Sequence, residues 1–215
     1  MMSGVAIDNT NDRAKISAMA KGELTRHAIL EEAVRVSSVR GLEGLTIGQL
    51  ADELNLSKSG LFAHFKSKEA LQIAVLGQAA ERFTEVVAKP ALKEARGEPR
   101  MRALFEHWLA WSRDQSMPGG CIFVTAAVEL DDQPGPLRDL LVRLQQDWID
   151  LIARCARVAV EVGHFRNNLD GRRFAQELYG VLLAHYHFTR LLGDPDTEAR
   201  TRAAFEHLLA RSRAV

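Results

Sequence analysis

Residues 46–71 read TIGQLADELNLSKSGLFAHFKSKEAL, and this stretch decides the fold. Thr46 is followed three positions later by Gln49, a capping-box spacing that predicts a helix start. Four apolar residues then recur at i, i+3, i+4 and i+7 and predict one buried helix face: Ile47, Leu50, Ala51 and Leu54. Asn55 follows, and asparagine tolerates the left-handed conformation that ends a helix in a sharp turn. The pattern therefore predicts a short helix followed by a tight turn.

A second short helix is predicted directly after the turn. Ser57 is a favourable N-cap for it, and Leu61, Phe62 and Phe65 are expected on its buried side. Lys58, Ser59 and His64 are left to face outward. Ser67 is placed to cap a third helix that begins at Lys68. This is the layout of a helix-turn-helix, in which the second short helix enters the DNA major groove.

The stretch resembles the DNA-binding segment of the tetracycline-repressor (TetR) family, on the run LSKSGLFAHFKSKEAL at 56–71 and the connector G-x-x-G-x-T at 41–46. Two positions depart from the family pattern: Asn55 replaces the usual Gly, and Phe62 replaces the usual Tyr, which removes a hydroxyl that contacts phosphate. The resemblance implies base-edge contacts from Lys58, Ser59 and Gly60, and phosphate contacts from Thr46, His64 and Lys68. With Phe62, these residues form the expected DNA-binding set.

The composition and charge of the chain limit the classes of function that it can have. The chain has 215 residues, 47% of them hydrophobic, and its 28 basic and 28 acidic residues give a formal net charge of zero. Such neutrality argues against a nonspecific nucleic-acid coat protein, which is strongly basic. Residues 54–68 nevertheless contain three lysines and no carboxylate, and a local basic edge is enough to engage phosphates.

Other classes of protein are not favoured. The two cysteines, Cys121 and Cys155, form neither a disulfide framework nor a metal-ligand spacing. No apolar run approaches the ~20 residues that span a bilayer, and no secretory signal is recognised, so a cytoplasmic location is expected. No nucleophile, glycine-rich loop or metal set accompanies Glu129, Asp131 and Asp132. We therefore expect no enzyme activity, no catalytic residue, no metal site and no cofactor.

The expected fold is all-α, with an N-terminal three-helix helix-turn-helix DNA-binding domain and a C-terminal helical ligand-binding and dimerisation domain. Residues 1–20 are expected to form a flexible arm, 21–72 the DNA-binding domain, and 73–215 the second domain. The first helix is predicted at 25–40, and the helix from Lys68 is predicted to end before Pro90. Further helices are predicted at 99–113, 121–130, 136–162, 170–192 and 197–211, with Asp170 as a cap.

The second half resembles the TetR ligand and dimerisation domain more weakly, on G-G-C at 119–121 and E-L-D-D-x-P-G-P at 129–136. Its aromatic residues are interpreted as a largely apolar pocket for a small hydrophobic or aromatic effector, with an ordinary core as the alternative. The predicted pocket residues are Phe105, Trp108, Trp111, Phe123, Trp148, Ile152, Tyr179, Leu183, Tyr186 and His187.

The last two predicted helices carry more apolar surface than one antiparallel pair can cover. A self-complementary four-helix interface between two copies is expected to bury it. The residues predicted for this homodimer interface are Phe174, Leu178, Val181, Leu182, His185, Phe188, Leu192, Phe205, Leu208 and Leu209.

Together these patterns predict a homodimeric, ligand-responsive transcriptional repressor that binds a near-palindromic double-stranded DNA operator. Two alternatives stay open. One is a redox or electrophile sensor on the same scaffold with Cys121 as its thiol, because a cysteine near a helix N-terminus can have a lowered pKa. The other is a helical small-molecule-binding protein without DNA function.

Overall fold

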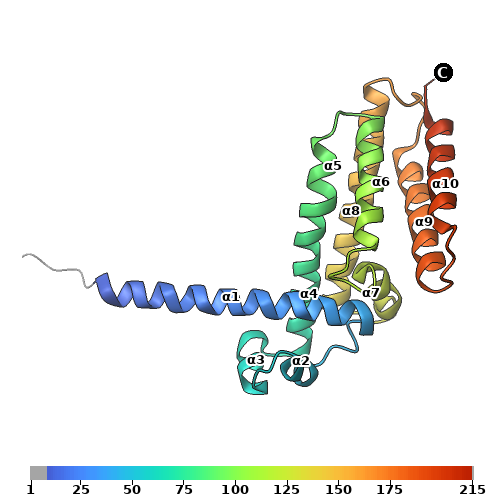
Figure 1. The fold of residues 1–215 in the computed structure, drawn as a ribbon. Coiled ribbons are helices and arrows are strands. Elements are labelled where there is room, and N and C mark those ends of the chain that lie inside the picture. The colour runs from blue at the N-terminus through green and yellow to red at the C-terminus, as the bar shows by residue number, and fades with distance from the viewer. Residues whose placement is uncertain (1–8, 215) are drawn as a thin grey trace, which may run out of the picture.

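The structure is a computed structural model that describes the backbone of residues 9–214 and the side chains of residue 22 and of residues 25–214. The described chain is built from helices, and an isolated antiparallel bridge joins Phe165 to Arg213. The all-α prediction with an N-terminal helix-turn-helix unit is confirmed (Figure 1). The elements are α1 (Asn9–Arg40), α2 (Ile47–Glu53), α3 (Lys58–Phe65), α4 (Lys68–Phe83), the π-helix η1 (Thr84–Ala88), α5 (Lys89–Lys93), α6 (Glu98–Ser112), α7 (Ile122–Leu130), α8 (Pro136–Glu161), α9 (Gly171–Arg190) and α10 (Thr197–Ser212).

The first helix begins earlier than predicted. Residues 1–8 of the predicted arm lie outside the described part of the chain, but the backbone from Asn9 onward is already helical. The start predicted at residue 25 is therefore wrong. Residues 13–21 read RAKISAMAK and consist largely of good helix formers without proline, so the helix continues through them.

A nearly unbroken helical column joins the two halves of the molecule. α4, η1 and α5 follow one another directly, and Figure 1 shows α4 and α5 as one column that rises from the α2–α3 unit into the upper bundle. α4 itself ends before Pro90, as predicted, but the column continues through η1 and α5, so that Pro90 lies inside it. Proline lacks an N–H and clashes with the carbonyl four residues earlier. The wider π-helical turn immediately before it accommodates that defect.

The remaining helices form the upper bundle. α5, α6 and α8 stand side by side, and α9 packs between α8 and α10 (Figure 1). Asp170 caps α9 as predicted, since its carboxylate accepts the N–H groups of Arg172 and Arg173 at 2.9 and 3.2 Å. One continuous set of buried apolar side chains runs from α1 and α4 into the bundle, so the described halves share a core rather than meeting at a linker.

The loop before α7 approaches α1 closely at Gly119. The N–H of Gly119 donates to the Ser38 hydroxyl at 3.1 Å, and a Cβ at this position would lie 1.6 Å from the Ser38 carbonyl oxygen. Gly119→Ala is therefore expected to lower the free energy of unfolding by about 1–3 kcal/mol, the usual cost of overpacking. Chemical denaturation measures this change. Gly77→Ala in α4 is the control, because open space surrounds that position and alanine in a helix should stabilise it slightly.

Candidate nucleic-acid interface and ligand pocket

The caps and turn of the helix-turn-helix have the predicted geometry. The hydroxyl of Thr46 accepts the N–H of Gln49 at 3.2 Å, and the hydroxyl of Ser57 accepts the N–H of Gly60 at 3.0 Å. The hydroxyl of Ser67 accepts the N–H of Ala70 at 3.1 Å. Asn55 adopts a left-handed φ of 53° between α2 and α3. These local hydrogen bonds satisfy N–H groups that helix starts leave free, so the sequence itself sets the angle at which α3 leaves α2.

The outer face of α3 is open to solvent. Leu61 and Phe65 lie one turn apart and are buried, but Phe62 is 52% exposed. The expectation that Phe62 lies on the buried side is therefore wrong, because the residue after Leu61 is rotated about 100° around the helix. The other predicted contacts at the start of α3 are exposed as well, and His64 is half-buried. The exposed side of α3 thus includes Lys58, Ser59, Gly60 and Phe62.

The two phosphate candidates outside α3 differ in their surroundings. Thr46 is exposed at the start of α2. The ammonium group of Lys68 donates to the carbonyl oxygen of Glu43 at 2.8 Å and lies 3.3 Å from the Glu43 carboxylate. A phosphate would have to compete with Glu43 for this lysine. The phosphate contact of Lys68 therefore stays a prediction, and its expected contribution to DNA affinity is smaller than that of an unpaired lysine.

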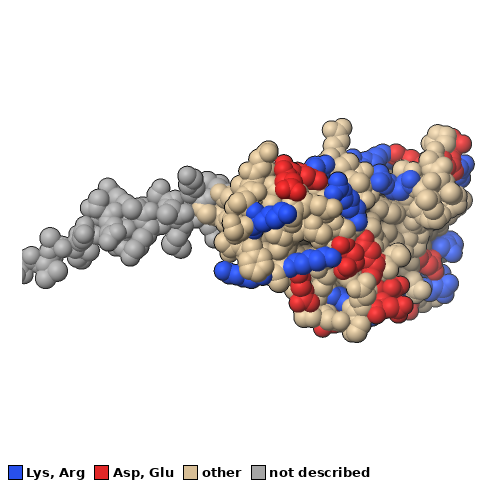
Figure 2. Space-filling view, turned by 90° about the horizontal axis from the view of Figure 1, so that it is seen from below, with Lys and Arg blue, Asp and Glu red and all other residues tan. Residues whose placement is uncertain are grey.

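Charge on this end of the molecule is mixed. Figure 2 views it from below and shows basic and acidic side chains interspersed over the face. Arg35 is paired with Glu32 and with Glu53, which also attracts Arg40. Positive charge that is already paired contributes little to long-range attraction of a polyanion. Affinity for DNA is therefore expected to rest on the few contacts that α3 makes directly.

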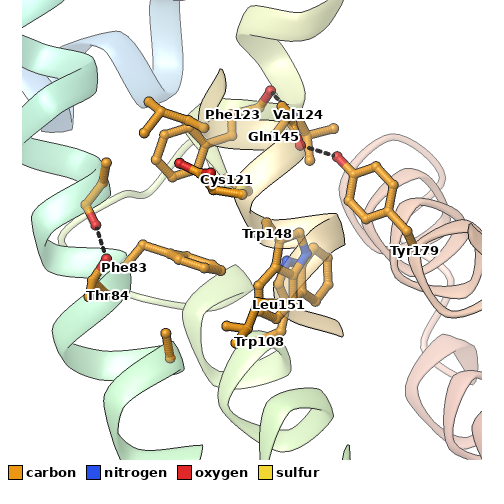
Figure 3. A pocket seen from close by; sticks show the side chains of 14 residues that line it. Phe83, Thr84, Trp108, Cys121, Phe123, Val124, Gln145, Trp148, Leu151 and Tyr179 are labelled. Carbon is orange, nitrogen blue, oxygen red and sulfur yellow. Dashed lines mark hydrogen bonds between the residues drawn. The ribbon is translucent and has the colours of Figure 1, made fainter. Parts of the chain in front are cut away.

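A cavity of about 150 Å³ lies among α4, η1, α6, α7, α8 and α9. Its walls are mainly aromatic and aliphatic, and Figure 3 shows rings from several helices facing one space. Tyr179 donates a hydrogen bond to Gln145 at 2.8 Å, and Gln145 donates to the carbonyl oxygen of Phe123 at 3.1 Å. The lining residues are Ala80, Phe83, Thr84, Ala88, Trp108, Cys121, Phe123, Val124, Leu144, Gln145, Asp147, Trp148, Leu151 and Tyr179.

The predicted pocket residues divide into two groups. Trp108, Phe123, Trp148 and Tyr179 line the cavity. The other six do not line it. Phe105 stacks on Phe205, and Trp111 and Ile152 are buried in the core. Tyr186 forms a hydrogen bond with Thr125, and Leu183 and His187 are exposed on α9. Ligand binding at the cavity stays a prediction.

The sequence interpretation missed the contribution of the helical column. Phe83 extends into the cavity region and makes edge-to-face contacts with Trp148 at 5.0 Å and with Phe123 at 5.9 Å (Figure 3). Ala80, Thr84 and Ala88 complete this wall. Phe83 continues the four-residue apolar spacing of Leu71, Val75 and Ala79. This spacing predicts an inward-facing side chain but does not distinguish a cavity wall from ordinary core.

Cys121 has the environment of a structural thiol. Its side chain is buried, and its sulfur accepts a hydrogen bond from the indole N–H of Trp111 at 3.3 Å. Burial raises the pKa of the Cys121 thiol. Since reactive cysteines have a lowered pKa and an accessible sulfur, this geometry gives the redox-sensor alternative no support. Cys155 is buried as well, and burial likewise raises the pKa of its thiol.

Tyr179 provides a pH-dependent signature of the cavity. Burial raises the pKa of its phenol to about 12, above the ~10 of an unfolded chain. Its contribution to stability is therefore present below pH ~10 and is lost as the pH rises towards 12. In an ultraviolet titration of tyrosinate, one of the two tyrosines is expected to ionise near pH 12. Tyr179→Phe should remove that late step, and a wild-type titration completed near pH 10 would contradict the assignment.

The predicted dimer surface needs correction. Seven of its ten residues are buried inside the single subunit and cannot form a free face: Phe174, Leu178, Leu182, His185, Phe205, Leu208 and Leu209. These side chains pack between α9 and its neighbouring helices. His185 also forms a hydrogen bond with Thr201 at 3.1 Å. Val181 is partly exposed, and Phe188 and Leu192 are exposed. Leu191, in the turn after α9, is exposed next to Leu192, and Leu183 is exposed elsewhere on α9.

The part of the chain that the structure describes contains neither a candidate metal site nor a helix that could span a membrane. No group of three or more His, Cys, Asp or Glu side chains there is arranged to hold a metal ion. Among residues 9–214, no helix combines the length and apolar character needed to cross a membrane.

The capped α2–turn–α3 unit and the all-helical second half with its cavity define a helix-turn-helix protein of two-part architecture. Residues 29–75 match the family described as bacterial regulatory proteins, tetR family, and residues 97–205 match the tetracyclin repressor-like C-terminal domain. The chain belongs to the TetR family of bacterial regulatory proteins.

Individual relatives agree with this assignment. The HTH-type transcriptional repressor AcnR of Corynebacterium diphtheriae is 36% identical over 92 residues, which cover 40% of this chain and 46% of AcnR. The match thus spans about half the length of that relative. A TetR transcriptional regulator from Chloroflexus aurantiacus superposes with a TM-score of 0.80 at 24% identity, over 91% of this chain and all of that one. AibR, solved with isovaleryl coenzyme A and operator DNA, superposes with a TM-score of 0.69 at 24% identity, over 87% and 99% of the two chains. These likenesses between structures show a shared fold.

Proposed function

We propose that this protein is a ligand-responsive, sequence-specific transcriptional repressor that binds a near-palindromic DNA operator as a homodimer. The observation that carries the proposal is the exposed outer face of α3, held by its capped start and by the left-handed turn at Asn55. Lys58, Ser59 and Gly60 stand at the start of α3, where recognition helices contact base edges. The repressor names of the curated relatives support the same function.

The exposed apolar residues of α9 and the following turn support a dimer. Phe188, Leu191 and Leu192 are large hydrophobic side chains that lie close together in sequence and face solvent. A groove of about 300 Å³ beside them runs between α9 and α10. Contiguous exposed apolar surface of this kind marks association sites, and a two-fold interface uses the same patch on both copies.

The cavity sets the size of the proposed effector. A space of about 150 Å³ accommodates a molecule of roughly one aromatic ring, as a cavity of that volume in another protein holds benzene. The proposed effector is therefore a small hydrophobic or aromatic compound, or a group of that size on a larger one. AibR, which shares this fold, has been solved in complex with both isovaleryl coenzyme A and operator DNA.

Selection of bound duplexes from random DNA tests the proposal. The expected product is a sequence with two inverted half-sites one helical turn apart, whose affinity falls steeply with added salt. Repeating the selection with small aromatic compounds should identify the effector as the one that releases the DNA. Failure to enrich any sequence, together with binding of small molecules, would favour a helical binding protein without DNA function.

A further inference from the structure

The short connector between α1 and α2 is held from two sides. Its backbone N–H groups at Leu42 and Glu43 both donate to one carboxylate oxygen of Glu129, at 2.8 and 3.2 Å. The carbonyl oxygen of Leu42 accepts the side-chain amide of Gln72 at 2.8 Å, and that of Glu43 accepts Lys68 at 2.8 Å. Glu129 belongs to α7, whereas Gln72 and Lys68 belong to α4. We name these five residues the connector clasp.

The fit at Glu129 is close. Gly41 ends α1 with a left-handed φ of 77°, and a Cβ at this position would lie 1.7 Å from the Glu129 carboxylate. Gln72 is buried, so its hydrogen bond to the connector has little competition from water. A carboxylate that accepts two backbone N–H groups makes charge-assisted bonds, which are stronger and more directional than neutral ones.

Both helices of the clasp also form walls of the cavity. α7 starts at the cavity with Cys121, Phe123 and Val124, and reaches the connector through Glu129 about 9 Å further along its axis. α4 reaches the connector through Gln72 and contributes Phe83 to the cavity about 16 Å away. Phe83 of α4 and Phe123 of α7 are in edge-to-face contact, with their ring centroids 5.9 Å apart.

We propose that the connector clasp couples the position of α7 relative to α4 to the position of the connector between α1 and α2. Glu129 is the positioning residue that transmits a displacement of α7 to the DNA-binding helices α2 and α3. A ligand that enters between Phe83 and Phe123 separates the two helices at their cavity ends. Because both helices hold the same two connector residues, that displacement reaches the backbone directly before Thr46, the cap of α2. The proposal rests on the proposed function, and it places a route through α7 beside the continuous column of α4, η1 and α5.

A double-mutant cycle tests this role without knowledge of the natural effector. Ala80→Phe on α4 adds a ring to the cavity wall and serves as an internal substitute for a ligand. Glu129→Ala removes the α7 side of the clasp, and Glu129→Gln is the milder variant should alanine prevent folding. Fluorescence anisotropy with the selected operator measures affinity for the wild type, both single variants and the double variant. Asp132→Asn is the matched control, because Asp132 is an exposed carboxylate just after α7 that does not contact the connector.

Ala80→Phe is expected to shift operator affinity by about tenfold in the wild-type background and by less than about threefold when Glu129 is replaced, a coupling between sites that cycles of this kind detect. Hydrogen exchange at the Leu42 and Glu43 amides should accelerate in both Glu129 variants and stay unchanged in Asp132→Asn. An equal shift in both backgrounds, no shift from Ala80→Phe alone, or unchanged exchange overturns the role of the clasp. Absence of operator binding by the wild type instead overturns the proposed function itself.

Discussion

Ser59→Glu is expected to reduce operator affinity at least ~100-fold, which corresponds to ~2.7 kcal/mol. Ser59 is exposed in the first turn of α3, where recognition helices approach base edges and phosphates. A carboxylate there meets the negative charge of the DNA and replaces a hydroxyl that can bond to any base. The fold should not suffer, because an acidic residue in the first turn of a helix is electrostatically favourable. Anisotropy with the selected operator measures the loss, and circular dichroism checks the fold.

Gln146→Glu is the control for Ser59→Glu, because it adds the same charge at an exposed position of α8, far along the chain from the helix-turn-helix. Its operator affinity should stay within about threefold of the wild type. If Ser59→Glu bound the operator as tightly as Gln146→Glu does, α3 would not be the helix that reads the DNA.

Phe188→Glu is expected to convert the dimer into monomers. Phe188 is 43% exposed on α9 in the single subunit, and a dimer through this face would cover it. An unpaired carboxylate buried at such an interface costs several kcal/mol, so the dimer dissociation constant should rise at least ~100-fold. Operator affinity should fall with it, because each monomer keeps only one half-site. Sedimentation equilibrium measures the association directly.

Leu92→Glu controls for added charge on an apolar surface, because Leu92 is 40% exposed on α5. This variant should remain a dimer. A Phe188→Glu protein that sediments as the wild type does would place the interface on another face of the molecule.

The sequence predicted the helix-turn-helix in detail because the signals that define it are local. Thr46, Ser57 and Ser67 cap helices through hydrogen bonds from N–H groups three positions ahead. The left-handed turn falls on Asn55, a residue type that tolerates this conformation. Such features require no knowledge of the rest of the chain. The exception is Phe62, where an aromatic residue in a helix suggested burial and the structure exposes it.

The sequence predicted the cavity and the interface less well because these depend on long-range packing. Apolar periodicity shows that Phe105 and Trp108 face inward, but not that Phe105 meets Phe205 while Trp108 reaches a cavity. The same ambiguity placed Leu178 and Leu209 on a dimer surface, although neighbouring helices of the same subunit bury them.

Glu129 illustrates a third case. The sequence places it among the acidic residues before a proline-containing loop, which suggests a solvated side chain. In the structure it bonds to backbone groups 86 and 87 residues away. No local pattern indicates such a contact.

Hydroxyl-radical footprinting of the wild-type protein on its selected operator tests the central claim most directly. The account predicts two protected windows on one face of the duplex, related by two-fold symmetry and about 34 Å apart, which disappear with Ser59→Glu. A single window without symmetry, or the same protection with Ser59→Glu, would contradict the assignment of residues 46–71 as the DNA-reading element.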